Sequence, residues 1–82
     1  MNQQLIFNDD YHFDAIHQAV SCSVLQAGLR LQVLILMPEG WQKEAWLYQV
    51  KEDCFFWEEQ IEAAVAAELF GEDGIVRLDG SL

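Results

Sequence analysis

Basic residues are scarce in this sequence, which has 4 Lys and Arg against 14 Asp and Glu and a formal net charge of −10. Binding to the phosphate backbone of a nucleic acid requires clustered Lys and Arg, and the basic residues here are dispersed along the chain. The composition therefore argues against nucleic-acid binding. A negative net charge instead favours solubility and rapid encounter with a basic partner, and it disfavours anionic membranes.

Cysteines and long apolar runs are also few. Cys22 and Cys54 lie far apart without a CxxC spacing, which indicates neither a disulfide framework nor a zinc ribbon, so we expect both to be reduced and buried. The longest apolar stretch, Leu29–Met37, contains polar residues and is too short to cross a bilayer. The N-terminal sequence lacks the basic and apolar segments of a secretory signal. We therefore expect a cytoplasmic protein.

Glycine is present only as 5 isolated residues, so no glycine-rich loop for binding phosphate is expected. Apolar residues make up 52% of the chain and aromatic residues 12%, which is typical of a chain that folds around a core. A length of 82 residues predicts a single domain, residues 1–82. Because so small a core stabilises a fold only modestly, we also expect self-association, most simply as a dimer.

Alternating apolar residues between Ala19 and Leu36 predict a β-hairpin, with Gly28 supplying the positive φ of a tight connection. The second strand of the hairpin is apolar on both faces near its end, so we expect it to be central in the sheet. Short strands are predicted at Leu5–Phe7 and Ile75–Leu78. Between the first of these strands and the hairpin, Asp9–His17 is predicted to be a loop or a single helical turn capped by Asp9 or Asp10.

The segment from Trp41 to Phe70 is predicted to be mostly helical, and Gly71 is placed to end the helix as its C′ residue. At 100° per residue a core-facing stripe is formed by Trp46, Leu47, Val50, Cys54, Trp57, Ile61, Ala64 and Val65. Trp46, Tyr48 and Val50 also alternate at period two, so Ala45–Val50 remains open between helix and strand. The predicted fold is α+β, with a small, mostly antiparallel sheet against one long or two short helices.

The order of these features resembles a family of short bacterial proteins known only as domain of unknown function fourteen eighty-eight. The resemblance is carried, over nearly the whole chain, by Leu5-Ile6-Phe7, Phe13-Asp14, Ala19-Val20-x-Cys22, Gly28-x-x-Leu31-x-Val33-x-Ile35, Trp57 to Ala64 and Gly74-Ile75-Val76. It implies a compact α+β fold. It implies no activity, because the family is uncharacterised.

Two groups of polar residues contain the side chains that catalysis or metal binding would use. The first is Asp9, Asp10, His12, Asp14 and His17, but His12 and His17 lie five apart, one position more than one helical face requires. The second is Ser21 and Ser23 with His17 and Asp14, which lack a Gly-x-Ser-x-Gly elbow. We therefore expect solvated carboxylates there, with no catalytic residue, no metal and no cofactor, and an enzyme is the less favoured interpretation.

A second apolar face of the helix is the more informative feature. It comprises Phe56, Ala63, Ala67 and Phe70, with Glu52 at its edge. Small alanines allow another helix to approach closely, and an exposed apolar face commonly marks an interface. The alternative is that the chain itself covers this face. The leading hypothesis is a non-enzymatic module that binds a basic protein or forms a homodimer, including a role accessory to regulation; the second is a small metal-dependent enzyme or regulator built on Asp9–His17.

Overall fold

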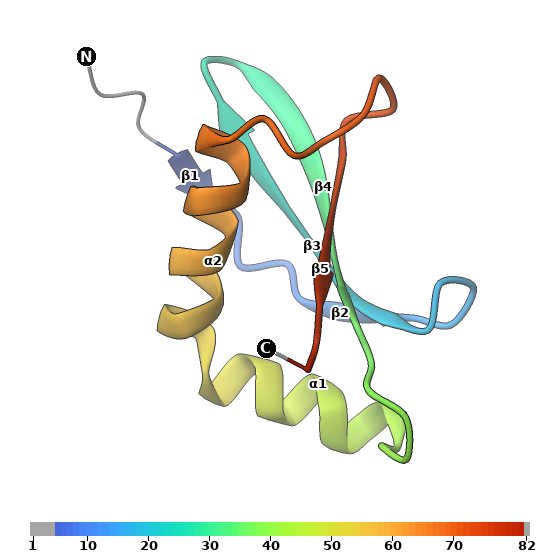
Figure 1. The fold of residues 1–82 in the computed structure, drawn as a ribbon. Coiled ribbons are helices and arrows are strands. Elements are labelled where there is room, and N and C mark those ends of the chain that lie inside the picture. Colours follow the sequence, from blue (N-terminus) through green and yellow to red (C-terminus); the bar gives the residue numbers. More distant parts are fainter. Residues whose placement is uncertain (1–4, 82) are drawn as a thin grey trace.

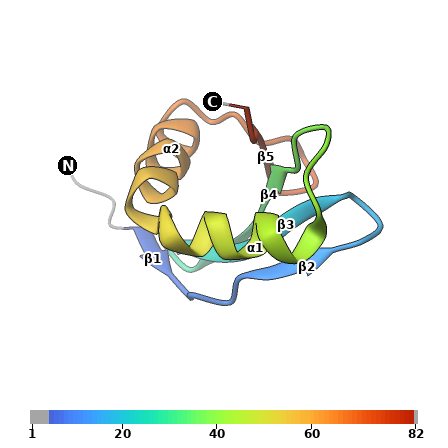
Figure 2. The same cartoon turned by 90° about the horizontal axis from the view of Figure 1, so that it is seen from below.

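The computed structural model describes residues 5–81, which form a twisted five-stranded sheet and two helices (Figure 1). In chain order the elements are β1 (Leu5–Phe7), β2 (His12–Asp14), β3 (Ala19–Gln26), β4 (Leu29–Leu36), α1 (Lys43–Glu52), α2 (Cys54–Ala66) and β5 (Ile75–Asp79). Both helices lie on the same side of the sheet (Figure 2). The predicted α+β class with a mostly antiparallel sheet is confirmed.

The hairpin of β3 and β4 is the centre of the sheet, and its strands pair antiparallel from Ala19↔Leu36 to Gln26↔Leu29. The two connecting residues, Ala27 and Gly28, have φ values of 51° and 83°. Two positive φ values give the chain the twist that a two-residue connection needs between right-twisted strands. β4 lies between β3 and β5, as predicted for a strand that is apolar on both faces.

β1 and β2 together form one edge of the sheet, because both pair antiparallel with β3. The prediction of a loop or a helical turn over Asp9–His17 is wrong for His12–Asp14, which is a strand. Only Phe13 of its three residues packs against the core, and one apolar residue is too little to show a period of two. The predicted cap is also wrong, since the carboxylate that accepts backbone N–H groups in the following turn belongs to Asp14, at 3.0 Å from Ile16 N and 3.1 Å from His17 N.

β5 forms the other edge and runs parallel to β4, with Gln32↔Ile75 and Leu36↔Asp79 at the ends of the pairing. A parallel neighbour requires a crossover connection, and α1 and α2 lie within that connection. Phe70 makes an isolated antiparallel bridge to Val76. The carboxylate of Asp73 accepts the backbone N–H of Ile75 at 3.1 Å. The first half of β5 is therefore occupied by contacts from its own loop.

The predicted helical segment divides into two helices at Asp53. Ala45–Val50 is helical, so the strand alternative is wrong. Trp46 and Val50, four residues apart on one face of α1, are both buried, and Trp46 Nε1 donates a hydrogen bond to the carbonyl oxygen of Ile35 at 3.2 Å. Tyr48, on the opposite face, is 65% exposed. The contacts of Trp46 with the sheet thus select the helical period over the period of two. 

The end of α2 differs from the prediction. The helix stops at Ala66, and the left-handed C′ residue is Glu68, with φ 56°, instead of Gly71. Backbone N–H groups of Glu68 and Leu69 donate to the carbonyl oxygens of Val65 and Ala64 at 3.0 and 2.9 Å. These two bonds define a Schellman motif, which glycine usually completes. Here Glu68 adopts the left-handed conformation although it has a Cβ atom.

The core lies between the helices and the sheet. It consists of Val20, Cys22, Val24, Leu31, Val33, Ile35, Trp46, Val50, Trp57, Ile61, Ala64, Val65, Val76 and Leu78. The predicted helical stripe is therefore buried, except that Leu47 and Cys54 are only half-buried. Cys54 is the first residue of α2, next to the break at Asp53, which leaves its side chain at the margin of the core. Both cysteines are unbridged, and the predicted burial is confirmed for Cys22 but wrong for Cys54.

Candidate functional site

The outward side of α2 and its C-terminal cap carries a set of exposed apolar side chains. We call this surface the α2 face; it consists of Phe55, Phe56, Ala63, Ala66, Ala67 and Leu69. Phe55 is 80% exposed, Leu69 65% and Phe56 40%. In Figure 1, α2 lies with one side against the sheet and the other turned away from it. Large apolar residues gathered in this way are unusual on a protein surface, where single exposed apolar residues are the norm.

Of the four predicted interface residues, three lie on this surface. Ala63 and Ala67 are exposed, and Phe56 is 40% exposed with part of its ring against Trp57. Phe70 is half-buried and packs against the core, where it bridges to Val76. It lies beyond the end of α2 and therefore leaves the helical face on which the 100° step had placed it. The most exposed members, Phe55 and Leu69, were missed because the 100° step places both between the predicted face and the core-facing stripe.

Acidic side chains stand among the apolar ones. Glu59 is three residues after Phe56 and four before Ala63, and Glu62 is four before Ala66, so both lie on the α2 face. Both are exposed. No Lys or Arg occurs between Cys54 and Phe70. Within residues 5–81 the ion pairs all use aspartates, and none of them involves these glutamates. The α2 face thus combines apolar side chains with acidic ones, and it has no basic side chain.

Phe56 is held in place by a row of aromatic rings. Its centroid lies 4.9 Å from that of Trp57, Trp57 lies 6.3 Å from Trp46, and Trp46 lies 5.1 Å from Trp41. All three contacts are edge-to-face, the arrangement that aromatic quadrupoles prefer. Because Trp46 and Trp57 are buried, the ring of Phe56 rests on the core through Trp57, whereas the neighbouring Phe55 extends into solvent.

The polar residues of Asp9–His17 are distributed over separate contacts. His17 Nδ1 lies 2.9 Å from Asp14 Oδ2, whereas His12 Nδ1 lies 3.1 Å from the carbonyl oxygen of Asp10. Hydrogen bonds from the side chain and the backbone N–H of His17 hold the pKa of Asp14 below its usual value. Within the described residues, no three His, Cys, Asp or Glu side chains are grouped to hold a metal ion.

Asp10 belongs to a different arrangement, at the interruption between β1 and β2. Its carboxylate accepts hydrogen bonds from the backbone N–H and the hydroxyl of Ser23, at 2.8 and 2.7 Å. Asn8 Nδ2 donates to the same hydroxyl oxygen at 2.9 Å, and Arg30 lies 3.8 Å from Asp10. Burial alone would raise the pKa of Asp10, but the hydrogen bonds from Ser23 outweigh it and lower the pKa. The carboxylate of Asp10 therefore accepts the Ser23 backbone N–H of β3 at the point where neither β1 nor β2 pairs with that strand.

The serines and the buried cysteine do not form a nucleophilic site. Ser23 donates its hydroxyl to Asp10, and the hydroxyl oxygen of Ser21 accepts from Gln32 Nε2 at 3.1 Å. Neither serine is hydrogen-bonded to His17. Burial, with the nearby Asp10 second, raises the pKa of Cys22 to about 12, so its thiol stays protonated at neutral pH. The hydroxyl groups of both serines are therefore engaged in hydrogen bonds with Asp10 and Gln32.

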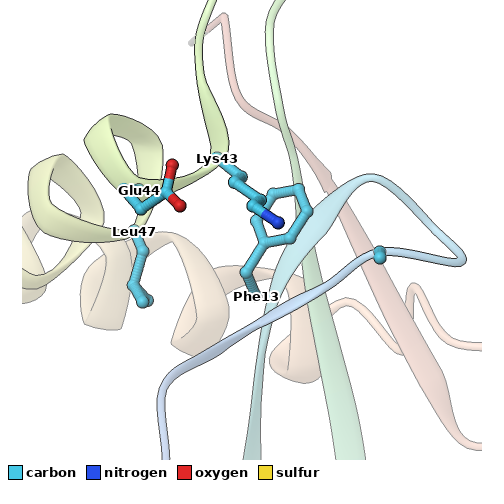
Figure 3. Close-up of a pocket in the computed structure, with 5 residues that line it drawn as sticks. Phe13, Lys43, Glu44 and Leu47 are labelled. Carbon is cyan, nitrogen blue, oxygen red and sulfur yellow. The ribbon is translucent and has the colours of Figure 1, made fainter.

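A hollow of about 220 Å³ lies where β2 meets the beginning of α1. It is lined by Phe13, Ala15, Lys43, Glu44 and Leu47 (Figure 3). Lys43 extends toward the ring of Phe13, and Leu47 lies beside Glu44 on the helix. Ligand pockets are typically larger and more enclosed, and they place several polar groups around one point. The hollow offers one amine and one carboxylate, so the α2 face is the stronger candidate.

Comparison with known proteins identifies a relative by fold. The structure is similar to the crystal structure of a protein of unknown function from the DUF1488 family of Shewanella loihica PV-4, with a TM-score of 0.82. The match covers 95% of this chain and 94% of the other, at 23% sequence identity. It confirms the fold expected from the family resemblance and supports that resemblance.

No family model matches this sequence, and no curated protein matches it. The function of the structural relative is unknown, so the comparison assigns none to this chain. Among residues 5–81, no helix is both long enough and apolar enough to span a membrane.

Proposed function

We propose that this protein works by binding another protein in the cytoplasm, without catalysis, and that the α2 face is its contact surface. The observation that carries the proposal is the 80% exposure of Phe55 next to Phe56, with Leu69 exposed beyond the opposite end of α2. Exposing a phenylalanine instead of burying it forgoes roughly 2 kcal/mol of transfer free energy. A fold with a small core gains nothing from this arrangement when it is alone. A partner that covers the rings would recover part of that free energy.

The arrangement of the face supports association in a second way. Binding energy at interfaces is concentrated in a few aromatic anchors that are rigid before contact. Phe56 is such an anchor because Trp57 holds its ring edge-to-face. Its fixed position lowers the conformational entropy that binding would cost.

Site-specific photocrosslinking tests this proposal. A photoreactive phenylalanine analogue replaces Phe55 in the protein expressed in the organism that encodes it, and crosslinked products are identified by mass spectrometry. Tyr48 is the matched control position, because it is an aromatic residue of α1 with 65% exposure.

We expect one dominant adduct from position 55, absent from position 48 and lost when Leu69→Ser is added. Identical adducts from both positions, or none from position 55, would contradict the proposal.

A further inference from the structure

The chemistry of the α2 face points to a particular kind of partner. We infer that its occupant is a basic amphipathic helix of another protein, and not a second copy of this chain. The inference rests on the proposed function, since it assumes that the α2 face is a binding surface.

The shape of the face fits a helix. α2 has 13 residues, which span about 20 Å at 1.5 Å per residue. The C-terminal half of α2 has small side chains on this face, those of Ala63, Ala66 and Ala67. Its N-terminal end has the large side chains of Phe55 and Phe56. Small side chains let two helices approach closely, and large ones at one end fill the groove between rows of the partner's side chains. A partner helix of four turns covers this length.

A β-strand is a poorer fit, because the backbone groups of a helix are already hydrogen-bonded. An added strand needs an open sheet edge. The β5 edge is bridged by Phe70 and capped by Asp73 at Ile75, and the opposite edge is divided into β1 and β2, which are three residues each. Binding through side chains on α2 is therefore the route that the fold leaves open.

The charge of the face specifies the partner further. Glu59 and Glu62 are exposed among the apolar residues, and Glu68 borders them at the cap. None has an ion-pair partner within residues 5–81. Lys or Arg spaced three or four residues apart on a partner helix would align with Glu59 and Glu62, which are themselves three apart. Such pairing favours the correct partner and speeds its encounter with an acidic protein.

A second copy of this chain lacks that complementarity. A two-fold symmetric contact brings the same patch of both copies together. Centred on Ala63, it would place the Glu62 carboxylates of two chains near the symmetry axis. Each chain also carries a net charge of −10, which opposes approach at low ionic strength.

Binding of designed peptides tests the inference. The probe is a fluorescent 18-residue amphipathic helix with leucine on one face and lysine on its borders. The first control peptide has glutamate in place of lysine. The second has the composition of the probe in scrambled order. Fluorescence anisotropy with the full-length protein gives Kd for each peptide at about 20 and 150 mM salt.

We expect the lysine peptide to bind at least tenfold more tightly than either control, with Kd rising with salt. Glu59→Gln and Glu62→Gln should each weaken it about two- to fivefold, the range for exposed ion pairs. Glu44→Gln, on α1, is the matched control and should leave Kd unchanged.

Three outcomes would overturn the inference, and they differ in what they say of the proposed function. Equal binding of the lysine and glutamate peptides, lost on Phe55→Ser, would leave the α2 face as a binding surface but remove the charge requirement. Self-association seen by sedimentation velocity and lost on Phe55→Ser would make a second copy the occupant. Equal binding of the lysine and scrambled peptides that survives Phe55→Ser would remove both the partner helix and the surface.

Discussion

Gly80 follows β5, and its Cα lies against the carbonyl group of Leu36 and the indole ring of Trp46. A Cβ atom at this position would stand 2.7 Å from Trp46 Cζ2 and would overlap the carbonyl oxygen of Leu36. Trp46 cannot retreat easily, because it is buried and its Nε1 is hydrogen-bonded to Ile35. Gly80→Ala should therefore lower the free energy of unfolding by about 1–3 kcal/mol, the usual cost of overpacking.

Urea denaturation followed by tryptophan fluorescence measures this loss. Gly71→Ala is the matched control, because the nearest atom to a new Cβ there is a carboxylate oxygen of the exposed Asp73 at 3.3 Å, a contact that a small shift of that side chain relieves. It should change the free energy of unfolding by less than about 0.5 kcal/mol. Equal effects of the two substitutions would show that Gly80 is not held against the core.

At the scale of the element, the cap of α2 offers a test of backbone strain. Glu68 occupies the left-handed C′ position with φ 56°, a conformation that costs an L-amino acid about 1 kcal/mol and glycine almost nothing. Glu68→Gly should therefore stabilise the protein by about 0.5–1 kcal/mol, less the entropy that glycine adds to the unfolded chain.

Thermal or urea unfolding of the variant checks this gain. Glu72→Gly is the same substitution at a turn residue without positive φ, so it should give no gain. If Glu68→Gly destabilised the protein as much as Glu72→Gly, the Schellman motif would not be the source of strain.

The same elements show which parts of the fold the sequence could predict. The hairpin and the core stripe of the helices were predictable because Val20, Cys22 and Val24, or Trp57 and Ile61, repeat at the period of their element. β2 was not, since its strand character comes from pairing with β3 and not from its own three residues. The end of α2 was placed at Gly71 because glycine is the usual C′ residue, and a left-handed Glu68 has no signature in sequence.

For the candidate site, the residues predicted from the sequence include three of the six that form the α2 face, and their role as an interface stays a prediction. Phe56, Ala63 and Ala67 follow from the helical period, and the structure leaves them exposed. Phe70 was misplaced because the period was extended past the end of the helix. The exposure of Phe55 could not be inferred, because whether a second apolar face is covered depends on where the sheet lies.

At the scale of the whole molecule, the free energy of unfolding should decrease at acid pH. Hydrogen bonds to Asp10, Asp14 and Asp73 hold the pKa of each folded carboxyl below its usual value of 3.8. The unfolded chain therefore binds more protons in acid than the folded chain does. The contribution of these groups is complete above the unfolded pKa and is lost as the pH falls below about 3.8 through the folded values.

Asp10→Asn isolates one of these contributions. The variant should be less stable than the wild type at pH 7, and the difference should shrink as the pH falls through the lowered folded-state pKa of Asp10, below which the wild-type carboxyl is also neutral. Urea unfolding at each pH gives this difference. Glu39→Gln, at an exposed carboxylate, is the control. A difference that stayed constant for Asp10→Asn would show that its hydrogen bonds with Ser23 do not depend on its charge.

The two edges of the sheet also bear on how the protein behaves when it is concentrated. An open strand edge is a template on which other chains can add, and it is a common origin of amyloid-like aggregation. Here one edge is split between β1 and β2, with Asp10 bonded to Ser23 in the gap. The other is bridged by Phe70. Neither edge presents a long uninterrupted row of backbone donors and acceptors, so the protein can display an apolar helix at high concentration while its sheet resists fibril growth.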